Sequence, residues 1–336
     1  MIKINEKSIS LKEFITLEFF SENVQKLFDI KLISESPDLT KKIYDQNLHR
    51  PGLALAGFVD LFAYKRVQVF GNTEMRYLEH LTEKEQRNSL ETIFNFEIPC
   101  IILSNNNKPT KLLSELAAKY RVPLFSSQYT TTKLNYLISD FLDDQFAERI
   151  TLHGSFMDVY GVGILFVGKS GIGKSEVSLD LVERGHRLVA DDVIILTKKG
   201  EGILMGAGTD IVKHFMEIRG LGVIDVERMF GIRAIRYQKR LEIVVELEVW
   251  DDTRHYTRTG LAEETVAISN VEIPYIKLPI LPAKNITVIS EVIALNYLLK
   301  HYGFDAAKVF QERLNEHLKK KSEGKRGIDY FEHDFE

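Results

Sequence analysis

The chain has 336 residues, of which 44% are hydrophobic and 27% are charged. This composition is ordinary for globular proteins and excludes a fibrous or intrinsically disordered chain, and the length predicts two domains. The net charge of -4 gives no bulk electrostatic reason to bind nucleic acid or an anionic membrane.

The amino terminus and the cysteine content indicate the compartment. Residues 1–14 carry charges throughout and lack the apolar core of a secretory signal. No apolar run approaches the roughly 18 residues of a membrane span. The single cysteine, Cys100, excludes an internal disulfide and fits a reducing compartment. We therefore expect a cytoplasmic protein that binds neither nucleic acid nor membranes.

The first part of the chain alternates strand-like and helix-like segments. Short apolar runs at 66–70 and 100–103 predict strands, and the charged segment 74–94 favours helix. Apolar residues at helical spacing follow a polar start within 129–149. We place a domain junction near its end. The predicted domains are 1–145, an α/β domain with a structural or assembly role, 146–320, a catalytic domain, and 321–336, a flexible tail.

The second part reads as strand, glycine loop, helix and strand, over 163–167, 175–184 and 187–196. Residues 240–250 alternate apolar and charged side chains, as a half-exposed antiparallel strand does, so we expect a mixed sheet. Helices are predicted at 289–302 and 305–321. The predicted class is α/β, with an amino-terminal α/β domain and a carboxy-terminal P-loop domain built on a mixed sheet.

The loop between the first strand and helix fits the pattern of glycine, four residues, then glycine, lysine and serine. Bare glycine backbone lets amides turn inward around phosphate oxygens, and the following helix start adds partial positive charge. The lysine would bridge the terminal phosphates of ATP and the serine would bind Mg²⁺. The alternative is a purely structural glycine turn that binds no ligand. The loop residues are Gly168, Lys169, Ser170, Gly171, Ile172, Gly173, Lys174 and Ser175.

Acidic and basic candidates lie on either side of this loop. Asp191 and Asp192 leave the next predicted strand, where a doubly wound sheet presents its carboxyl edge to a ligand. When two carboxylates are adjacent, the pKa of one is easily raised, or that carboxylate binds a metal. An acidic turn at a strand end is the alternative. His153, taken alone, is more often a surface or core histidine than a catalytic one.

Residues 216–231 combine acids, an arginine and close-spaced glycines, which suggests a loop whose backbone approaches a ligand. A plain glycine-rich turn into a helix at 226–230 remains the alternative, and spacing alone does not decide. The candidate residues here are Glu217, Arg219, Gly220, Gly222 and Asp225.

Together these segments resemble the HPr kinase/phosphorylase family. The matching segments are His153-Gly154, the whole loop continuing into Glu176, the run 183–192, and the run 217–225. Two amino-terminal segments, 50–57 and 66–74, match as well, so the resemblance spans most of the chain.

The resemblance implies an activity and its partners. Members phosphorylate a serine of the phosphocarrier HPr with ATP, or with pyrophosphate, and remove it with inorganic phosphate, giving pyrophosphate. They regulate carbon metabolism and sugar uptake and are expected to be homohexamers. By motif, Lys174 binds phosphate, Ser175 and Glu217 hold Mg²⁺, and Asp192 is the base for serine and the acid in reverse. His153 is its proton-relay partner, and Arg258 would stabilise charge on the transferring group.

One segment departs from the family pattern. Where the family reads Pro-Val-Arg-Pro-Gly-Arg-Asn, this chain has Leu281 and Lys284 in place of the two arginines, after Pro279. The family associates this loop mainly with dephosphorylation, and lysine does not reproduce an arginine fork on phosphate. The resemblance therefore implies that the departure affects dephosphorylation more than the kinase reaction. Two rival functions stay open, a P-loop kinase of a small metabolite and a nucleotide-binding regulator without chemistry.

Overall fold

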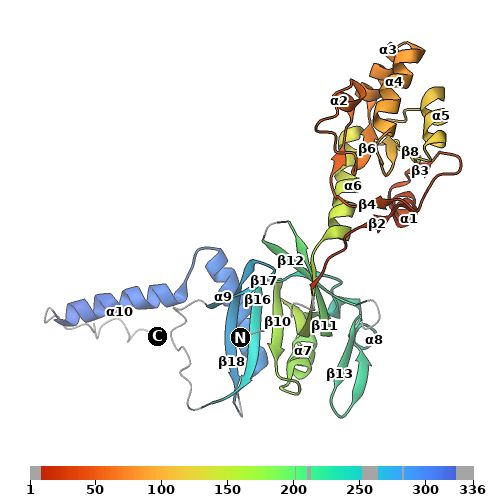
Figure 1. Ribbon diagram of the computed structural model, residues 1–336. Coiled ribbons are helices and arrows are strands. Elements are labelled where there is room, and N and C mark those ends of the chain that lie inside the picture. The colour runs from red at the N-terminus through yellow and green to blue at the C-terminus, as the bar shows by residue number, and fades with distance from the viewer. Residues whose placement is uncertain (1–8, 201, 210–212, 252–263, 282–283, 323–336) are drawn as a thin grey trace. The chain divides into compact units, whose positions relative to one another are not determined.

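The structure is a computed structural model that describes residues 9–200, 202–209, 213–251, 264–281 and 284–322 (Figure 1). The chain divides into two compact units, one comprising Ser10–Glu148 and the other beginning at Arg149 with Ile9 added to it. Helix α6, which precedes the division, ends at Phe146. Residues 323–336 of the expected flexible tail lie outside the described residues.

The amino-terminal unit is built on a five-stranded sheet in the order β3-β8-β7-β6-β5. Strands β5 to β8 pair in parallel, and β3 pairs antiparallel with β8. The strands of this unit are β2 (Ile15–Thr16), β3 (Lys31–Leu32), β4 (Lys42–Ile43), β5 (Leu48–His49), β6 (Val67–Phe70), β7 (Ile101–Leu103) and β8 (Leu124–Ser126). Its helices are α1 (Leu17–Phe28), α2 (Gly52–Leu55), α3 (Asn72–His80), α4 (Glu83–Phe94), α5 (Lys111–Lys119) and α6 (Thr131–Phe146).

The charged segment 74–94 forms parts of two helices. Helix α3 ends before Leu81, and Thr82 begins α4 by accepting a hydrogen bond from the Glu85 amide, while the Glu85 carboxylate accepts one from the Thr82 amide. This reciprocal cap satisfies two amides that a helix start leaves open, so it fixes the break between the two helices.

The carboxy-terminal unit is built on a sheet that, within the described residues, has nine strands in the order β15-β12-β11-β9-β10-β16-β18-β17, with β1 (Ile9–Ser10) paired to β9. Its other strands are β9 (Arg149–Val159), β10 (Val162–Gly168), β11 (Arg187–Lys199), β12 (Ile203–Gly208), β15 (Lys239–Arg240), β16 (Ile243–Val249), β17 (Glu264–Ile268) and β18 (Val271–Ile280). A separate hairpin is formed by β13 (Phe215–Ile218) and β14 (Gly222–Asp225). The helices are α7 (Lys174–Glu183), α8 (Val226–Phe230), the 3-10 helix η2 (Ile232–Ala234), α9 (Ile286–His301) and α10 (Ala306–Ser322).

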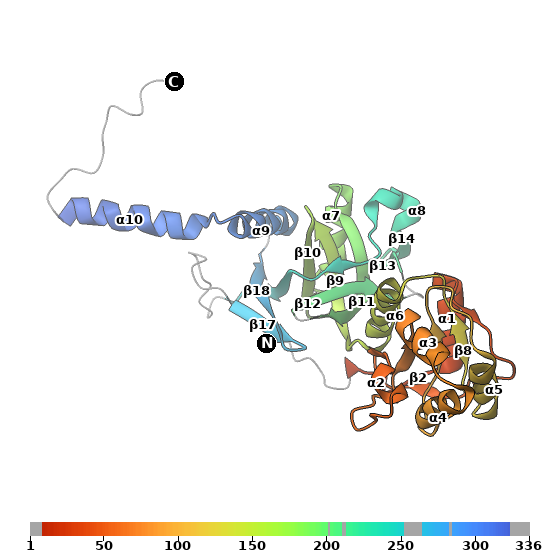
Figure 2. The same ribbon diagram turned by 90° about the horizontal axis from the view of Figure 1, so that it is seen from above.

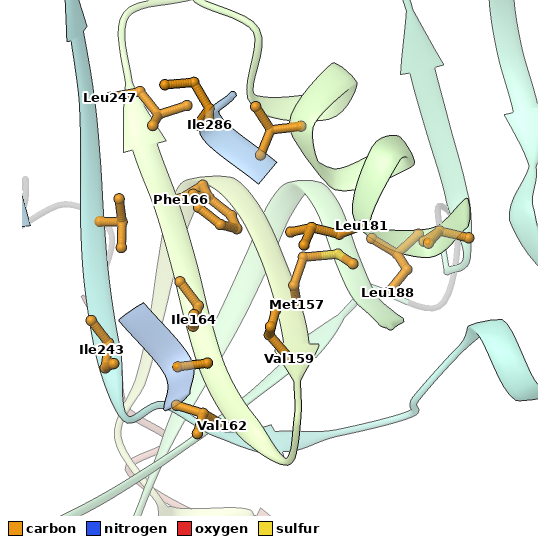
Figure 3. Close-up of a cluster of buried hydrophobic side chains, with 14 of the residues drawn as sticks. Met157, Val159, Val162, Ile164, Phe166, Leu181, Leu188, Ile243, Leu247 and Ile286 are labelled. Carbon is orange, nitrogen blue, oxygen red and sulfur yellow. The ribbon is translucent and has the colours of Figure 1, made fainter. Parts of the chain in front are cut away.

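Alternation along β10 produces two cores, because successive side chains of a strand point to opposite faces. Ile164 and Phe166 enter one buried cluster, and Leu165 and Val167 enter another on the opposite face. Figure 3 shows the first cluster, in which Phe166 and Met157 of the sheet pack with Leu181 of α7. Helix α7 contacts β9, β10 and β11, with α9 on one side of it and the β13–β14 hairpin on the other (Figure 2).

The predicted α/β class with a mixed sheet is confirmed, but the strand used to infer the mixed sheet was assigned wrongly. Strand β16 pairs in parallel with both β10 and β18 in the middle of the sheet. Its charged side chains Glu246 and Glu248 imitated the alternation of a half-exposed strand. The antiparallel pairs are β9 with β10 and β11, β11 with β12, and β17 with β18.

The two adjacent aspartates do not lie at a strand end, as expected, but in the middle of β11. Because β9 pairs antiparallel with both β10 and β11, those two strands run in the same direction. Through Ser155 of β9, Asp191 is level with Phe166 near the end of β10. The aspartates therefore lie at the height of the glycine loop, although β11 continues past them.

None of the helices in the described part of the chain is long and apolar enough to cross a membrane.

Candidate functional site

The glycine loop joins the end of β10 to the start of α7, and its backbone requires glycine. Gly168 has φ 141°, and a Cβ built there would lie 2.4 Å from the carbonyl oxygen of Leu247. Gly173 has φ 100° and precedes α7 without a side-chain cap. The first amides of α7 are therefore left for an outside acceptor, and a helix start with open amides favours an anion.

Lys174 and Ser175 are the first two residues of α7, and their polar atoms contact neighbouring groups. The Lys174 ammonium donates to the carbonyl oxygens of Gly168 and Lys169, at 3.3 and 3.2 Å, so it lies over the loop. The Ser175 hydroxyl donates to Oδ2 of Asp191 at 2.8 Å. The helix start thus presents one cation over the loop and one hydroxyl oxygen already paired with a carboxylate.

Asp191 is only 4% exposed, and the pKa of its carboxyl is shifted. Burial raises the pKa of this carboxyl above its ordinary value, and the charge of Asp192 adds to the rise, while hydrogen bonds from Ser155 and Ser175 oppose it. A backbone hydrogen bond at Asp192 also lowers the pKa, but neutral hydroxyl and amide donors compensate a buried negative charge incompletely. A cation arriving from outside would therefore bind this carboxylate favourably.

Asp192 has the opposite exposure, with 74% of its side chain accessible. Its φ of 66° is left-handed, an uncommon conformation for a residue other than glycine, and it interrupts the extended backbone of β11. His153 lies alongside, with Nδ1 3.2 Å from the carbonyl oxygen of Asp192 and 3.7 Å from its carboxylate Oδ1. Because a carbonyl oxygen only accepts, Nδ1 carries the proton in this arrangement. The structure brings together the acid and the histidine that the resemblance pairs.

The β13–β14 hairpin brings a further cation to the loop. Nη2 of Arg219 donates to the Ser170 hydroxyl at 3.2 Å, and a Cβ on Gly171 would lie 2.2 Å from the same guanidinium. Gly220 and Gly222 turn the hairpin with φ of 84° and 100°. The expected close approach of their backbone to a ligand stays a prediction, since both glycines are exposed and turn the chain.

Within the described residues, the other predicted residues form no hydrogen bond with the groups described above. Glu217 is exposed on β13, and the described residues show no hydrogen bond from it to Ser175. Asp225 caps α8 by accepting from the Arg228 amide at 3.0 Å. Lys284 donates to the carbonyl oxygen of Pro279 at 3.4 Å, beyond the carboxyl end of β18. Arg258 lies outside the described residues.

Two neighbours of this centre were given no role in the sequence predictions. Ser155 is fully buried between Asp191 and the Ser178 hydroxyl, which is 2.7 Å away. A Cβ on Gly154 would lie 2.4 Å from the carbonyl oxygen of Phe166, so only glycine fits between β9 and β10 there. The position of this small polar residue directly before the apolar pair Phe156-Met157 was the available signal for Ser155.

The donor set fits magnesium. No group of three histidine, cysteine, aspartate or glutamate side chains in the described part of the chain forms a ready metal cage. Magnesium usually binds through one or two carboxylates, water and substrate phosphates, so such a cage is not required. The Ser175 hydroxyl beside the uncompensated Asp191 carboxylate is a hard-oxygen pair of that type.

Comparison with known proteins gives the family. Residues 20–142 match the family model described as HPr Serine kinase N terminus, and residues 144–314 match HPr Serine kinase C-terminal domain. The chain belongs to the HPr kinase/phosphorylase family. It is 54% identical over 331 residues to HPr kinase/phosphorylase of Chloroherpeton thalassium, covering 97% of each chain.

Two further relatives complete this comparison. HPr kinase/phosphorylase of Prosthecochloris aestuarii is 51% identical over 332 residues, covering 96% of this chain and 97% of the relative. The solved structure of the Hpr(Ser) kinase/phosphatase from Coxiella burnetii is 33% identical with a TM-score of 0.42, covering 46% of this chain and 99% of that chain. The resemblance predicted from the motifs is confirmed, and as a member of this family the chain is a kinase/phosphorylase enzyme.

Proposed function

We propose that this HPr kinase/phosphorylase family member transfers the terminal phosphate of ATP to a serine of HPr and removes it again with inorganic phosphate. The observation that carries the proposal is the convergence of the glycine loop, Asp191, Asp192 and His153 at one end of α7 in a chain of this family. Phosphoryl transfer depends mainly on positioning and charge neutralisation, which these groups supply.

In the forward direction, the serine oxygen attacks the terminal phosphorus of ATP in line, a new P–O bond forms, and the bond to ADP breaks. Asp192 takes the serine proton, since its carboxylate is the exposed acid at the loop. His153, with Nδ1 3.7 Å from that carboxylate, would accept the proton at Nδ1 in the tautomer whose N–H is on Nε2, and pass it onward. The amides at the start of α7 and Lys174 would hold the phosphates.

In the reverse direction, an oxygen of inorganic phosphate attacks the phosphorus of phosphoserine. The bond between phosphorus and the serine oxygen breaks, Asp192 returns the proton to that oxygen, and pyrophosphate leaves. Magnesium held by Ser175 and Asp191 would neutralise phosphate charge, with Glu217 as the ligand that the resemblance implies.

Cytoplasmic location, assembly as a homohexamer and a role in carbon regulation belong to the same proposal.

The experiment is incubation of the purified protein with HPr, ATP and magnesium, followed by excess phosphate, with phosphoserine and pyrophosphate measured together. Phosphoserine that rises and then declines as pyrophosphate appears supports both reactions. Persistent phosphoserine means that only the kinase reaction operates. Phosphate found on a metabolite indicates a small-molecule kinase, and ATP binding without turnover indicates a non-catalytic regulator.

The altered segment after β18 gives a specific test of the reverse reaction. We expect Leu281→Arg with Lys284→Arg to raise phosphorolysis about tenfold, the effect of one gained charge-assisted hydrogen bond, because guanidinium groups bind phosphate in a bidentate manner. Phosphorylation should change little. Steady-state rates of both reactions measure the ratio. Equal effects on both rates would contradict the assignment of this segment to dephosphorylation.

A further inference from the structure

Two buried serines adjoin the Asp191 carboxyl group where α7 packs on the sheet. Ser155 of β9 and Ser178 of α7 are both fully buried, and their hydroxyl oxygens are 2.7 Å apart. The Ser155 hydroxyl also forms a hydrogen bond with Asp191. The three side chains therefore form a continuous hydrogen-bonded chain that begins on the helix and ends at the carboxyl group beside the glycine loop.

The hydrogen bonds of this chain have a defined direction. An ionised carboxylate only accepts, so Ser155 donates its single hydroxyl proton to Asp191. Ser155 then has only lone pairs for its second contact, so Ser178 is the donor there. Both hydrogen bonds point toward the carboxylate, and hydrogen bonds aligned in this way polarise and strengthen one another.

Helix α7 reaches this carboxylate twice. Ser175 and Ser178 are three positions apart, a spacing that places two side chains on one face of a helix. Ser175 contacts Asp191 directly at 2.8 Å, whereas Ser178 contacts it through Ser155. The register of β9 with β11 places Ser155 directly opposite Asp191. The carboxylate is thereby held by two hydroxyl groups whose positions depend on the helix and the sheet.

The surroundings of the two serines are apolar. Figure 3 shows Met157, two positions along β9 from Ser155, and Leu181, three positions along α7 from Ser178, in one buried cluster. Hydroxyl groups buried among apolar side chains cost free energy unless they are hydrogen-bonded, and alanine at both positions would avoid this cost. The serines therefore serve a purpose other than packing, and their contact with Asp191 supplies one.

We propose that Ser155 and Ser178 are positioning residues that orient the Asp191 carboxylate for a divalent cation bound at Ser175. This role rests on the magnesium site of the proposed function. A cation at the Ser175 oxygen would replace the hydrogen bond from Ser175 to Asp191. Among the described residues, Ser155 is then the side-chain donor that fixes the rotation of the carboxylate.

Calorimetric titration of Mg²⁺ alone into the full chain tests this role. Ser155→Ala should weaken Mg²⁺ binding about tenfold, as the loss of a group that orients a metal ligand does. Ser178→Ala should weaken it about twofold, because Ser178 acts through Ser155. The double variant should lose about tenfold and no more, since without Ser155 the Ser178 hydroxyl does not reach the carboxylate.

Two further variants serve as references. Ser290→Ala is the matched control, because Ser290 is a fully buried serine of α9 whose hydroxyl donates to the carbonyl oxygen of Ile286 at 2.8 Å. Its Mg²⁺ affinity should equal that of the native protein. Asp191→Asn removes the ligand itself. If Asp191→Asn leaves Mg²⁺ binding unchanged, the magnesium site of the proposed function is wrong and the positioning role fails with it.

Other results would overturn the positioning role alone. One is weaker binding in Asp191→Asn with unchanged binding in Ser155→Ala. Tighter binding in Ser155→Ala would show that this serine competes with the cation. A loss of about twentyfold in the double variant, the product of the single effects, would show that the two serines act independently. If Ser155→Ala does not fold, unchanged affinity in Ser178→Ala still contradicts the relay, and an equal loss in Ser290→Ala would indicate general loosening of the core.

Discussion

A buried carboxylate lies beside each end of α7, Asp191 of β11 at one end and Glu291 of α9 at the other. The environments of these two carboxylates differ sharply. Asp191 at the loop end is 4% exposed, and Glu291 at the far end is 6% exposed. Burial raises the pKa of Asp191, whereas hydrogen bonds from Arg184, aided by His186, lower the pKa of Glu291 to about 2. Burial has the largest influence on the pKa of Asp191, whereas the hydrogen bond from Arg184 has the largest influence on that of Glu291, so the two pKa values move in opposite directions.

This difference indicates which end is complete. Glu291 receives its compensating charge from within the chain, through a bidentate contact that ties α9 to the end of α7. Asp191 receives hydroxyl donors from Ser155 and Ser175, which leaves it able to bind a cation from outside. Poorly compensated charge of this kind is typical of a functional site, while the paired charge contributes to folding.

The largest expected effect tests whether the loop end performs the chemistry. Asp192→Asn should lower the rate of transfer by about 1000-fold, since it removes the proposed base, and should leave nucleotide affinity nearly unchanged. Single-turnover rates and nucleotide titration measure the two effects. Asp140→Asn, an exposed aspartate on α6, is the control. Retained turnover in Asp192→Asn would refute the assignment.

Glu291→Gln tests the paired end. We expect a loss of about 2 kcal/mol in the free energy of unfolding at neutral pH, because Arg184 and His186 lose their charged partner. The folded pKa lies below the ordinary value of 4.5, so the native carboxylate contributes stability above pH 4.5. That contribution is lost as the pH falls toward about 2, and the difference between native protein and variant should shrink over this range.

Urea denaturation at a series of pH values measures this difference. A constant difference from neutral pH to pH 3 would mean that lost packing, and not lost charge, weakens the variant. Glu272→Gln, on an exposed position of β18, serves as a carboxylate control in the same unit.

Asp191→Asn should change stability in the opposite direction, with a smaller effect. The raised pKa means that the ionised carboxyl opposes folding at neutral pH, so removing it should stabilise the protein. This gain should vanish below about pH 3.8, where both states are protonated. Magnesium affinity should fall about 10- to 100-fold, as for other groups around metal sites. A stability loss at neutral pH would contradict the comparison.

Much of the local organisation could be predicted from the sequence. The strand before the glycine loop was expected at 163–167 and is β10, and the helix after it was expected at 175–184 and is α7. Local patterns suffice there, because glycine spacing and a short apolar run are determined by neighbouring residues. The same reasoning failed for β16, since alternation reports exposure and does not report strand direction.

The site required contacts that sequence spacing does not contain. Ser175 and Asp191 are 16 residues apart, and His153 and Asp192 are 39 apart. Their meeting depends on the register of β9 with β10 and β11, including the irregularity between Leu188 and Ala190. A shift of one residue would turn each side chain to the other face.

By itself, the sequence determined the glycine loop between a strand and a helix, the family resemblance and the main helices, because each depends on residue types a few positions apart. The tertiary structure alone decided that Asp191 is buried beside Ser175 without a guanidinium, and that Glu291, 107 residues from Arg184, is paired with one. Burial and charge pairing depend on which distant segments pack together, and those properties separate two carboxylates that look alike in sequence.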